Sequence, residues 1–261
     1  MSSKEKLLLL TNFLIYGFVA IFSYSYVDLN LTLSQNPVAL SFISKMQQLA
    51  YYNRPLATTI FSLFLVTSFS FFILNLFLFY KNKIGSTYLK FAAVLNALIL
   101  IFAYPFLSYD IFNYMFDAKI ITTYHQNPYL HKALDYPQDE WLRFMRWTHR
   151  YSPYGPIWLV ASVVPSALGF GKFILTLFVF KLFIGAFHLI NALLIYKTLQ
   201  KINPKFSNFG TAFYALNPLF LIEGVANSHN DVVLAFFMLL SIYFVASNKK
   251  MKAISVMIIG A

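Results

Sequence analysis

The sequence predicts an all-α, polytopic membrane protein with a single transmembrane domain over residues 1–261, and three observations lead to this fold class. Hydrophobic residues make up 59% of the chain and charged residues only 11%, which is far more apolar than a soluble domain. The apolar residues form runs of about 20, the length that a helix needs to cross a bilayer. Short lysine clusters separate these runs, a pattern that encodes the orientation of membrane helices.

The apolar runs give the predicted spans in order. The basic segment Met1–Lys6 precedes a long first run without a small-residue cleavage site, so we expect a retained helix and not a signal peptide. The predicted spans cover residues 7–27, 56–80, 88–107, 173–197, 207–224 and 232–247, and another begins near residue 253. Because the sequence stops inside this last run, we expect a C-terminally truncated protein.

The lysine clusters predict which side of the membrane each loop faces, because cytoplasmic loops are the lysine-rich ones. The clusters lie at residues 4–6, 81–90, 197–205 and 249–252. All of them fall on one side if the apolar piece Ile157–Phe170 does not cross the membrane. This piece is short and contains Pro165 and Gly169, so we expect a re-entrant or interfacial segment. The N-terminus is then cytoplasmic, and the loop 108–172 and the segment Asn227–Asp231 are extracytoplasmic.

The net charge and the absence of cysteine exclude several classes of protein. The formal net charge is +11, but nucleic-acid-binding proteins gather their basic residues on a soluble domain, whereas these lysines lie between apolar runs. We therefore expect the lipid bilayer as a partner and no nucleic acid. The sequence contains no cysteine, which excludes disulfides, thiolate metal sites and a cysteine nucleophile.

The segment from Tyr104 to Trp158 is the longest polar stretch and collects carboxylates, arginines, histidines and tyrosines. Ser108 is suited to cap a helix, and Asp110 then lies in the first turn, where the helix macrodipole favours a negative charge. At helical spacing one face carries Asp110, Asn113, Tyr114 and Asp117. We expect this helix on the membrane surface with its carboxylates in a cleft, where Asp110 can act as a general base. The alternative is a solvated polar face with a capping carboxylate.

A second helix is predicted over Gln138–Arg150. Arg143, Arg146 and Arg150 recur on one face of it, and His149 lies beside them. Arginine side chains suit phosphate oxygens, but a basic face resting on anionic lipid headgroups is an equally simple explanation. Either role implies an anionic lipid as the partner.

Lys181 lies inside a predicted span, where a charge is costly and usually faces the bundle interior or a wet cavity. It shares a helical stripe with Gly185 and His188. We expect it to line a cavity and not to extend to the membrane surface, because it lies about two turns from the outer end of its span.

A further polar group interrupts the predicted span 207–224. Asn217 and Pro218 break the helix and free backbone carbonyls there. The outer end of the span carries Glu223, Asn227, His229, Asn230 and Asp231. Asp231 alone is suited to cap the next helix, but the group as a whole is a candidate site on the same side as Asp110.

These segments together resemble the GT-C superfamily of polyprenyl-phosphate-sugar-dependent glycosyltransferases, with prokaryotic mannosyltransferases of the lipoglycan type as the nearest likeness. The resemblance covers residues 104–231. It rests on D-x-x-x-Y from Asp110 to Tyr114, NPY from Asn127 to Tyr129, YSPYGP from Tyr151 to Pro156, and NPL from Asn217 followed by NSHND up to Asp231.

The resemblance implies an enzyme that transfers a hexose, by preference mannose, with inversion. The donor would be a polyprenyl-phosphate sugar, and the acceptor a hydroxyl of a glycan or glycolipid outside the cell membrane. Asp110 matches the catalytic Asp, and no acid is needed because phosphate leaves as an anion. Some relatives carry D-x-D where this sequence has Phe112, which leaves a divalent metal open; no other cofactor is expected. The residues expected to bind substrate are Tyr114, Asp117, Arg146, His149, Arg150, Tyr154, Lys181, Glu223, Asn227, His229, Asn230 and Asp231.

Two other classes of function stay open from the residues alone. A transporter of an anionic or lipid-linked substrate would place its site near the bilayer midplane in broken helices of two matching halves. Lys181 and His188 favour transport, whereas the sequence shows no half repeat. A non-catalytic lipid-binding subunit would use the basic segment without the base.

Overall fold

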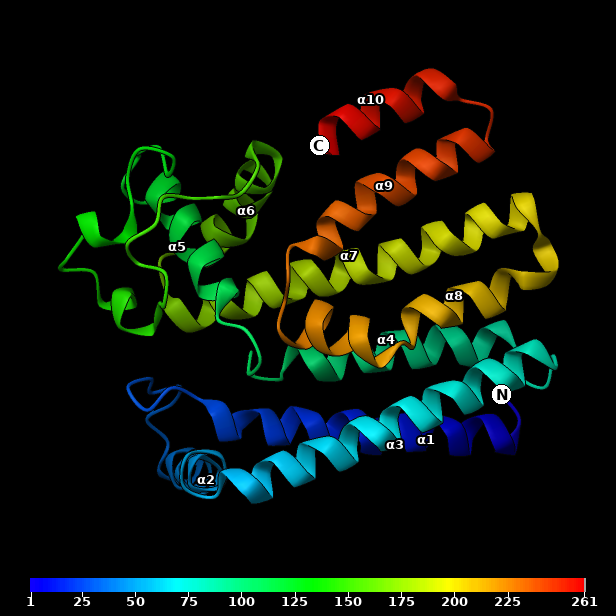
Figure 1. Cartoon of the computed structure of the whole chain (residues 1–261), viewed down its shortest axis with the longest axis horizontal. Coiled ribbons are helices and arrows are strands. Elements are labelled where there is room, and N and C mark those ends of the chain that lie inside the picture. The colour runs from blue at the N-terminus through cyan, green and yellow to red at the C-terminus, as the bar shows by residue number, and fades with distance from the viewer. Residues whose placement is uncertain (261) are drawn as a thin grey trace.

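The chain folds into long helices that lie side by side, with a smaller group of helices and turns at one end (Figure 1). This computed structural model describes residues 1–260. Helices account for 75% of the chain, and the part that the structure describes contains no strand. The predicted all-α fold is confirmed, and the apolar helices described below are those of a membrane protein.

Three helices are long and apolar enough to cross a membrane. They are α1 (Ser3–Ser23, continued by a 3-10 turn to Tyr26), α3 (Arg54–Tyr80) and α7 (Phe173–Ile202). Two shorter apolar helices follow predicted spans, namely α4 (Ser86–Ile101) and α9 (Asp231–Ala246), and the helix α10 (Lys250–Gly260) covers the last run. The helix α4 ends six residues before the predicted boundary, because the chain turns away ahead of Pro105.

The span predicted over residues 207–224 is a bent pair of helices. The helix α8 (Ser207–Ala215), extended at its start by a 3-10 turn from Pro204, and the π-helical segment η6 (Phe220–Ala226) are bent by 57° relative to one another. Pro218 lies in the break, where it cannot donate a backbone hydrogen bond, and the side chain of Asn217 accepts one from the Leu219 N–H at 3.0 Å. Counted as one span, the pair would be a fourth membrane-crossing element.

Polar side chains join the first helices inside the bundle. The Asn12 amide donates to the Tyr88 hydroxyl at 2.9 Å, and Tyr88 donates to Asn75 at 2.6 Å. The Asn96 amide donates to Asn12 at 3.0 Å. Hydrogen bonds of this kind replace the hydrophobic driving force that helices lack in lipid, so this network fixes α1, α3 and α4 against one another.

The two ends of the bundle differ in composition. In Figure 1 the N-terminus and the α3–α4, α7–α8 and α9–α10 connections, which carry the lysine clusters, lie at the right-hand end. The opposite end holds α2 (Pro37–Gln47), α5 (Asp110–Thr122) and α6 (Pro156–Leu168). The helix α6 corresponds to the segment expected not to cross, and it packs against α5 and α7. The helix α2 was not predicted.

The prediction of a helix over Gln138–Arg150 is wrong. Only Glu140–Phe144 forms a 3-10 helix; Met145 is extended, and the chain then continues to Arg150 in bends and turns. Two side chains of this turn, Trp141 and Phe144, are buried against the ring of Phe173 with centroids 5.3 and 4.7 Å away. Burying these rings requires the segment to wrap around the end of α7, which a straight helix could not do.

Candidate active site

Asp110 is the first residue of α5, and its side chain is 32% exposed. The N-cap position belongs to Tyr109 and not to Ser108 as predicted. The Ser108 hydroxyl instead accepts a hydrogen bond from the Asp110 N–H at 3.2 Å. The carboxylate therefore belongs to the first turn of α5, where the partial positive charge of the helix N-terminus stabilises an anion.

The helix α5 is enclosed on both faces and does not lie open on a surface. The apolar residues Ile111, Met115 and Phe116 are fully buried, but Asn113 and Asp117 on the polar face are also buried. The helices α6 and α7 and the turn Ala133–Asp135 pack against α5, and its polar face borders a cavity that the following loop closes.

This polar cavity has a volume of about 180 Å³. It is lined by Asp110, Asn113, Asp117, Ala133, Met145, Trp147, Arg150, Tyr151, Pro153 and Tyr154. Both carboxylates of the predicted helix face thus reach the same cavity, as expected, together with one arginine and three aromatic rings. The D-x-x-x-Y helix supplies one wall, and the YSPYGP segment supplies another.

Asp117 is the most deeply buried carboxylate that lines the polar cavity, with 8% of the residue exposed. Burial raises the pKa of its carboxyl group to about 6, an effect that the nearby Ser152 hydroxyl partly offsets. Within residues 1–260, three buried oxygens here have no hydrogen-bond partner: Asp117 Oδ2, Asn113 Oδ1 and Ser152 Oγ.

The YSPYGP segment is held in place by the NPY motif. The Tyr129 hydroxyl donates to the Tyr154 carbonyl at 2.7 Å, and the Ser152 N–H donates to the Pro128 carbonyl at 3.0 Å. The Tyr154 ring packs edge-on against Tyr114 at 4.9 Å, and burial raises the pKa of both phenols. The motifs of the resemblance are therefore neighbours in space.

The connection between η6 and α9 brings the NSHND segment to Asp110. Ser228 has a left-handed backbone with φ of 59°, which redirects the chain after η6. The next residue, His229, lies at the centre of a carboxylate cluster. Its Nδ1 is 3.9 Å from Asp110 Oδ2 and 3.9 Å from Asp231 Oδ2, and its Nε2 is 3.5 Å from Glu223 Oε2. The segment η6, which precedes this connection, is π-helical, and π-helical turns are frequent at functional sites.

Hydrogen bonds of Asn227 and Asn230 join this connection to α5 and to the residues that precede α5. The Asn227 side-chain oxygen accepts hydrogen bonds from the N–H groups of Phe106 and Leu107 at 2.9 and 3.0 Å. The Tyr114 hydroxyl donates to Asn230 at 3.1 Å. The position of Asp110 is thus fixed from both sides, by its own helix and by residues more than a hundred positions later.

The predicted basic residues do not form one face. Arg146 lies over the Tyr109 ring at 4.2 Å, and Arg150 lies over the Trp147 ring at 4.6 Å. His149 is exposed. Only Arg150 of this group lines the polar cavity.

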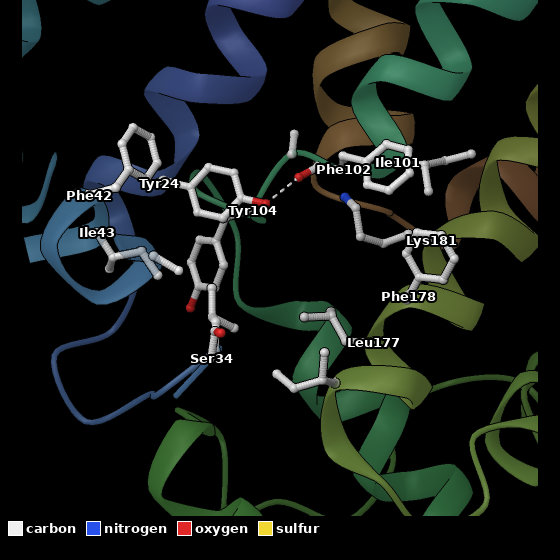
Figure 2. A pocket seen from close by; sticks show the side chains of 14 residues that line it. Tyr24, Ser34, Phe42, Ile43, Ile101, Phe102, Tyr104, Leu177, Phe178 and Lys181 are labelled. Atoms are coloured by element: carbon white, nitrogen blue, oxygen red, sulfur yellow. Dashed lines mark hydrogen bonds between the residues drawn. The ribbon is translucent and has the colours of Figure 1, made fainter. Parts of the chain in front are cut away.

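Lys181 lies in a different cavity from Asp110 (Figure 2). This apolar cavity of about 530 Å³ is bounded by the α1–α2 connection, the helix α2, the end of α4 with the residues after it, and the start of α7. The ammonium group donates to the carbonyls of Ala226 at 2.5 Å and Val225 at 3.4 Å. Lys181 therefore lines a cavity, as expected, but its visible partners are backbone groups at the end of η6.

The sequence interpretation missed an ion pair that fixes the loop after α5. Lys119 Nζ lies 2.5 Å from Asp139 Oδ2 and 4.0 Å from the centroid of Trp141, and Tyr124 donates to the same carboxylate at 2.6 Å. Burial alone would raise the pKa of Asp139, but the bonds from Lys119 and Tyr124 outweigh it and hold the pKa below its ordinary value. No sequence periodicity links these residues.

Metal binding was left open by the sequence. Among residues 1–260, no three His, Asp or Glu side chains are arranged to hold a metal ion. No residue is therefore assigned to a metal.

Comparison with known families identifies the chain. The family model described as alpha-(1->6)-mannopyranosyltransferase, N-terminal domain, matches residues 15–261. No curated protein and no solved structure matches the chain. The family match confirms the predicted glycosyltransferase and decides against a transporter or a non-catalytic lipid-binding subunit. The chain belongs to the MptA_B family of α-(1→6)-mannopyranosyltransferases and is a glycosyltransferase.

Proposed function

We propose that this membrane enzyme, of GT-C type, transfers a mannosyl residue from a polyprenyl-phosphate donor to a hydroxyl of a glycan or glycolipid, with inversion. The family description supports mannose as the transferred sugar and an α-(1→6) linkage, so the acceptor group is the primary 6-hydroxyl of a sugar. The observation that carries the proposal is the position of Asp110, which lies at a helix N-terminus where the polar cavity meets the His229 cluster.

The reaction needs one base and no acid. The acceptor oxygen attacks the anomeric carbon on the face opposite the phosphate, the bond from carbon to phosphate oxygen breaks, and Asp110 takes the acceptor proton. A single displacement inverts the anomeric centre, so an α product requires a β-linked donor. His229, 3.9 Å from Asp110, holds the carboxylate towards the cavity and is a positioning residue.

The departing phosphate needs a preorganised cation. Arg150 is the residue we assign, because its guanidinium group lines the polar cavity that also contains Asp110 and suits phosphate oxygens. Arg146 and His149 lie outside this cavity, and Lys181 is bonded to backbone carbonyls.

We place the site on the extracytoplasmic side of the cell membrane. The argument is the distribution of lysine, since cytoplasmic connections are the lysine-rich ones. The lysine-rich connections lie at one end of the bundle, and α5 and α6 lie at the other (Figure 1).

The test compares wild type, Asp110→Asn and Asp135→Asn in lipid vesicles with radiolabelled polyprenyl-phosphate mannose and a mannoside acceptor. Removing a general base typically slows a reaction about 10²–10⁴-fold, so Asp110→Asn is expected to lose transfer in this range. Asp135→Asn is the matched control, because Asp135 lies on the same loop and bonds the Lys132 N–H outside the polar cavity. Wild-type turnover in an Asp110→Asn protein with unchanged thermal unfolding would overturn the proposal.

A further inference from the structure

A second apolar cavity lies near the lysine-rich end of the bundle, where α4 and α7 pack side by side and α8 begins (Figure 1). Its volume is about 280 Å³, and we call it the α4–α7 groove. Its floor contains the buried residues Leu89, Ala93 and Ala192, and its edges contain Val94 and Leu193, which are 43% and 49% exposed. The groove therefore opens on the outer surface of the bundle, where lipid surrounds membrane-spanning helices.

Two lysines line the α4–α7 groove without an anionic partner. Lys90 and Lys197 are both exposed, and within residues 1–260 neither forms an ion pair with a carboxylate. In the part of the chain that the structure describes, neither ammonium group lies over an aromatic ring, whereas those of Lys81 and Lys201 at the same end do. The two charges at the groove are thus available to an external anion.

The carboxylates of the chain do not neutralise these two lysines. Glu5 is the only Asp or Glu at the start of α1 and in the α3–α4, α7–α8 and α9–α10 connections of the described chain. Both of its carboxylate oxygens are occupied, since Oε1 accepts a hydrogen bond from the Gly85 N–H at 2.9 Å and Oε2 accepts one from the Ser2 N–H at 2.8 Å. An anion at the groove must therefore come from outside the chain.

The chemistry and the size of the groove select an anionic phospholipid. Two ammonium groups beside an apolar groove match a phosphate joined to a hydrocarbon chain, and basic pockets between membrane helices bind such headgroups. The half-buried Tyr196 also lines the groove, and tyrosine is enriched at the depth of the headgroups.

Two other occupants fit less well. One turn of a helix from a partner protein, about 10 Å wide and about 5.4 Å high, fills roughly 400 Å³, which is more than the groove holds. A second copy of this chain, inserted in the same orientation, would bring its own lysines to the same depth, and like charges repel one another.

We infer that the α4–α7 groove binds one anionic phospholipid from the leaflet at the lysine-rich end, with its phosphate at Lys90 and Lys197 and an acyl chain along Ala93 and Ala192. The site lies at the end of the bundle opposite α5 and α6 (Figure 1), so the inference does not depend on the proposed function. The bound lipid joins α4 to α7 and stabilises the folded protein.

The experiment titrates the full chain in detergent with dioleoyl phosphatidylglycerol or dioleoyl phosphatidylcholine and measures bound lipid by native mass spectrometry. Two basic side chains near an anionic lipid are together worth roughly thirtyfold in affinity, so wild type is expected to bind the anionic lipid at least tenfold more tightly than the zwitterionic one. Lys90→Gln combined with Lys197→Gln is expected to lose this preference. Lys249→Gln combined with Lys250→Gln removes the same charge at the same end but outside the groove, and is expected to keep the preference.

A second pair of variants distinguishes a lipid seated in the groove from diffuse attraction to lysines. Val94→Trp fills the groove while both lysines stay, and is expected to weaken binding of phosphatidylglycerol at least tenfold. Leu98→Trp, at a position of α4 that is 50% exposed and outside the groove, is expected to leave binding unchanged. All the substituted side chains are exposed, so the variants are expected to fold, and their circular dichroism spectra check this.

Three results would overturn the inference. The first is equal affinity of wild type for the two lipids. The second is an equal loss of affinity in the two lysine pairs, which would show diffuse attraction only. The third is unchanged binding of phosphatidylglycerol by a folded Val94→Trp protein, which would place the acyl chain elsewhere.

Discussion

Replacing Asp117 by Asn is expected to stabilise the protein without ligand at neutral pH. Burial raises the carboxyl pKa from 3.8 to about 6, so the folded protein holds this proton more tightly than the unfolded chain does. At ~1.4 kcal/mol for each pKa unit, ionising the buried group costs roughly 3 kcal/mol of folding free energy above pH 6. Asn has the same shape and carries no charge, so the variant avoids this cost.

The sign of the pH dependence follows from the direction of the shift. Stability from a raised pKa is fully present below pH ~4 and is lost as the pH rises through about 6. Wild type and Asp117→Asn should therefore unfold at similar temperatures at pH 4, and the variant should be the more stable at pH 7.5. A chain of this size shifts its Tm by roughly 2–4 °C for each kcal/mol, so the difference should reach several degrees.

Thermal unfolding in lipid nanodiscs, followed by intrinsic fluorescence at both pH values, measures this difference. Asp135→Asn is the control, because its exposed carboxylate should not reproduce the effect. A variant that is less stable than wild type at pH 7.5 would refute the reasoning, since it would mean that Asp117 has partners that stabilise its charge.

The remaining predictions concern contacts around the site. Lys119→Met leaves the Asp139 carboxylate, whose side chain is 2% exposed, as an unpaired charge, which should lower the free energy of unfolding by about 3–5 kcal/mol. A lower Tm and faster proteolysis of the loop after α5 would show this loss. Lys119→Arg should restore the Tm and the resistance to proteolysis. Asn227→Leu removes the acceptor for the N–H groups of Phe106 and Leu107 and should lower kcat at least tenfold through a displaced Asp110, with donor KM less affected. Lys181→Met should lower the Tm while leaving the KM for the donor within about twofold of the wild-type value. A large rise in this KM would mean that Lys181 binds the donor.

The sequence predicted those parts of the fold that depend on local interactions. In lipid, an apolar run must form a helix so that its backbone N–H and C=O groups are hydrogen-bonded. For this reason α1, α3 and α7 begin and end close to the predicted boundaries. The Arg143–Arg150 pattern failed because long-range contacts decided the backbone there. Asp139 pairs with Lys119 twenty residues earlier, and the rings of the turn are drawn to α7, so spacing alone was misleading.

The candidate site was likewise predicted only in part. Asp110 and the NSHND segment were expected on one side, and His229 lies 3.9 Å from Asp110. Which NSHND side chain approaches Asp110 depends on the left-handed backbone at Ser228 and on the π-helical turns before it. Ser152 was missed as a neighbour of Asp117 because nothing in a motif reports which of its side chains is buried.

The hydrogen bonds from Phe106 and Leu107 to Asn227 also set the order in which the enzyme is completed during synthesis. Phe106 leaves the ribosome 121 residues before its partner Asn227. Until Asn227 is made, the backbone that leads into α5 lacks the acceptor that fixes it, and His229 is also absent. We therefore expect a nascent chain to insert its early helices long before it can bind or transfer a sugar, so that the membrane enzyme becomes active only after its late helices are in place.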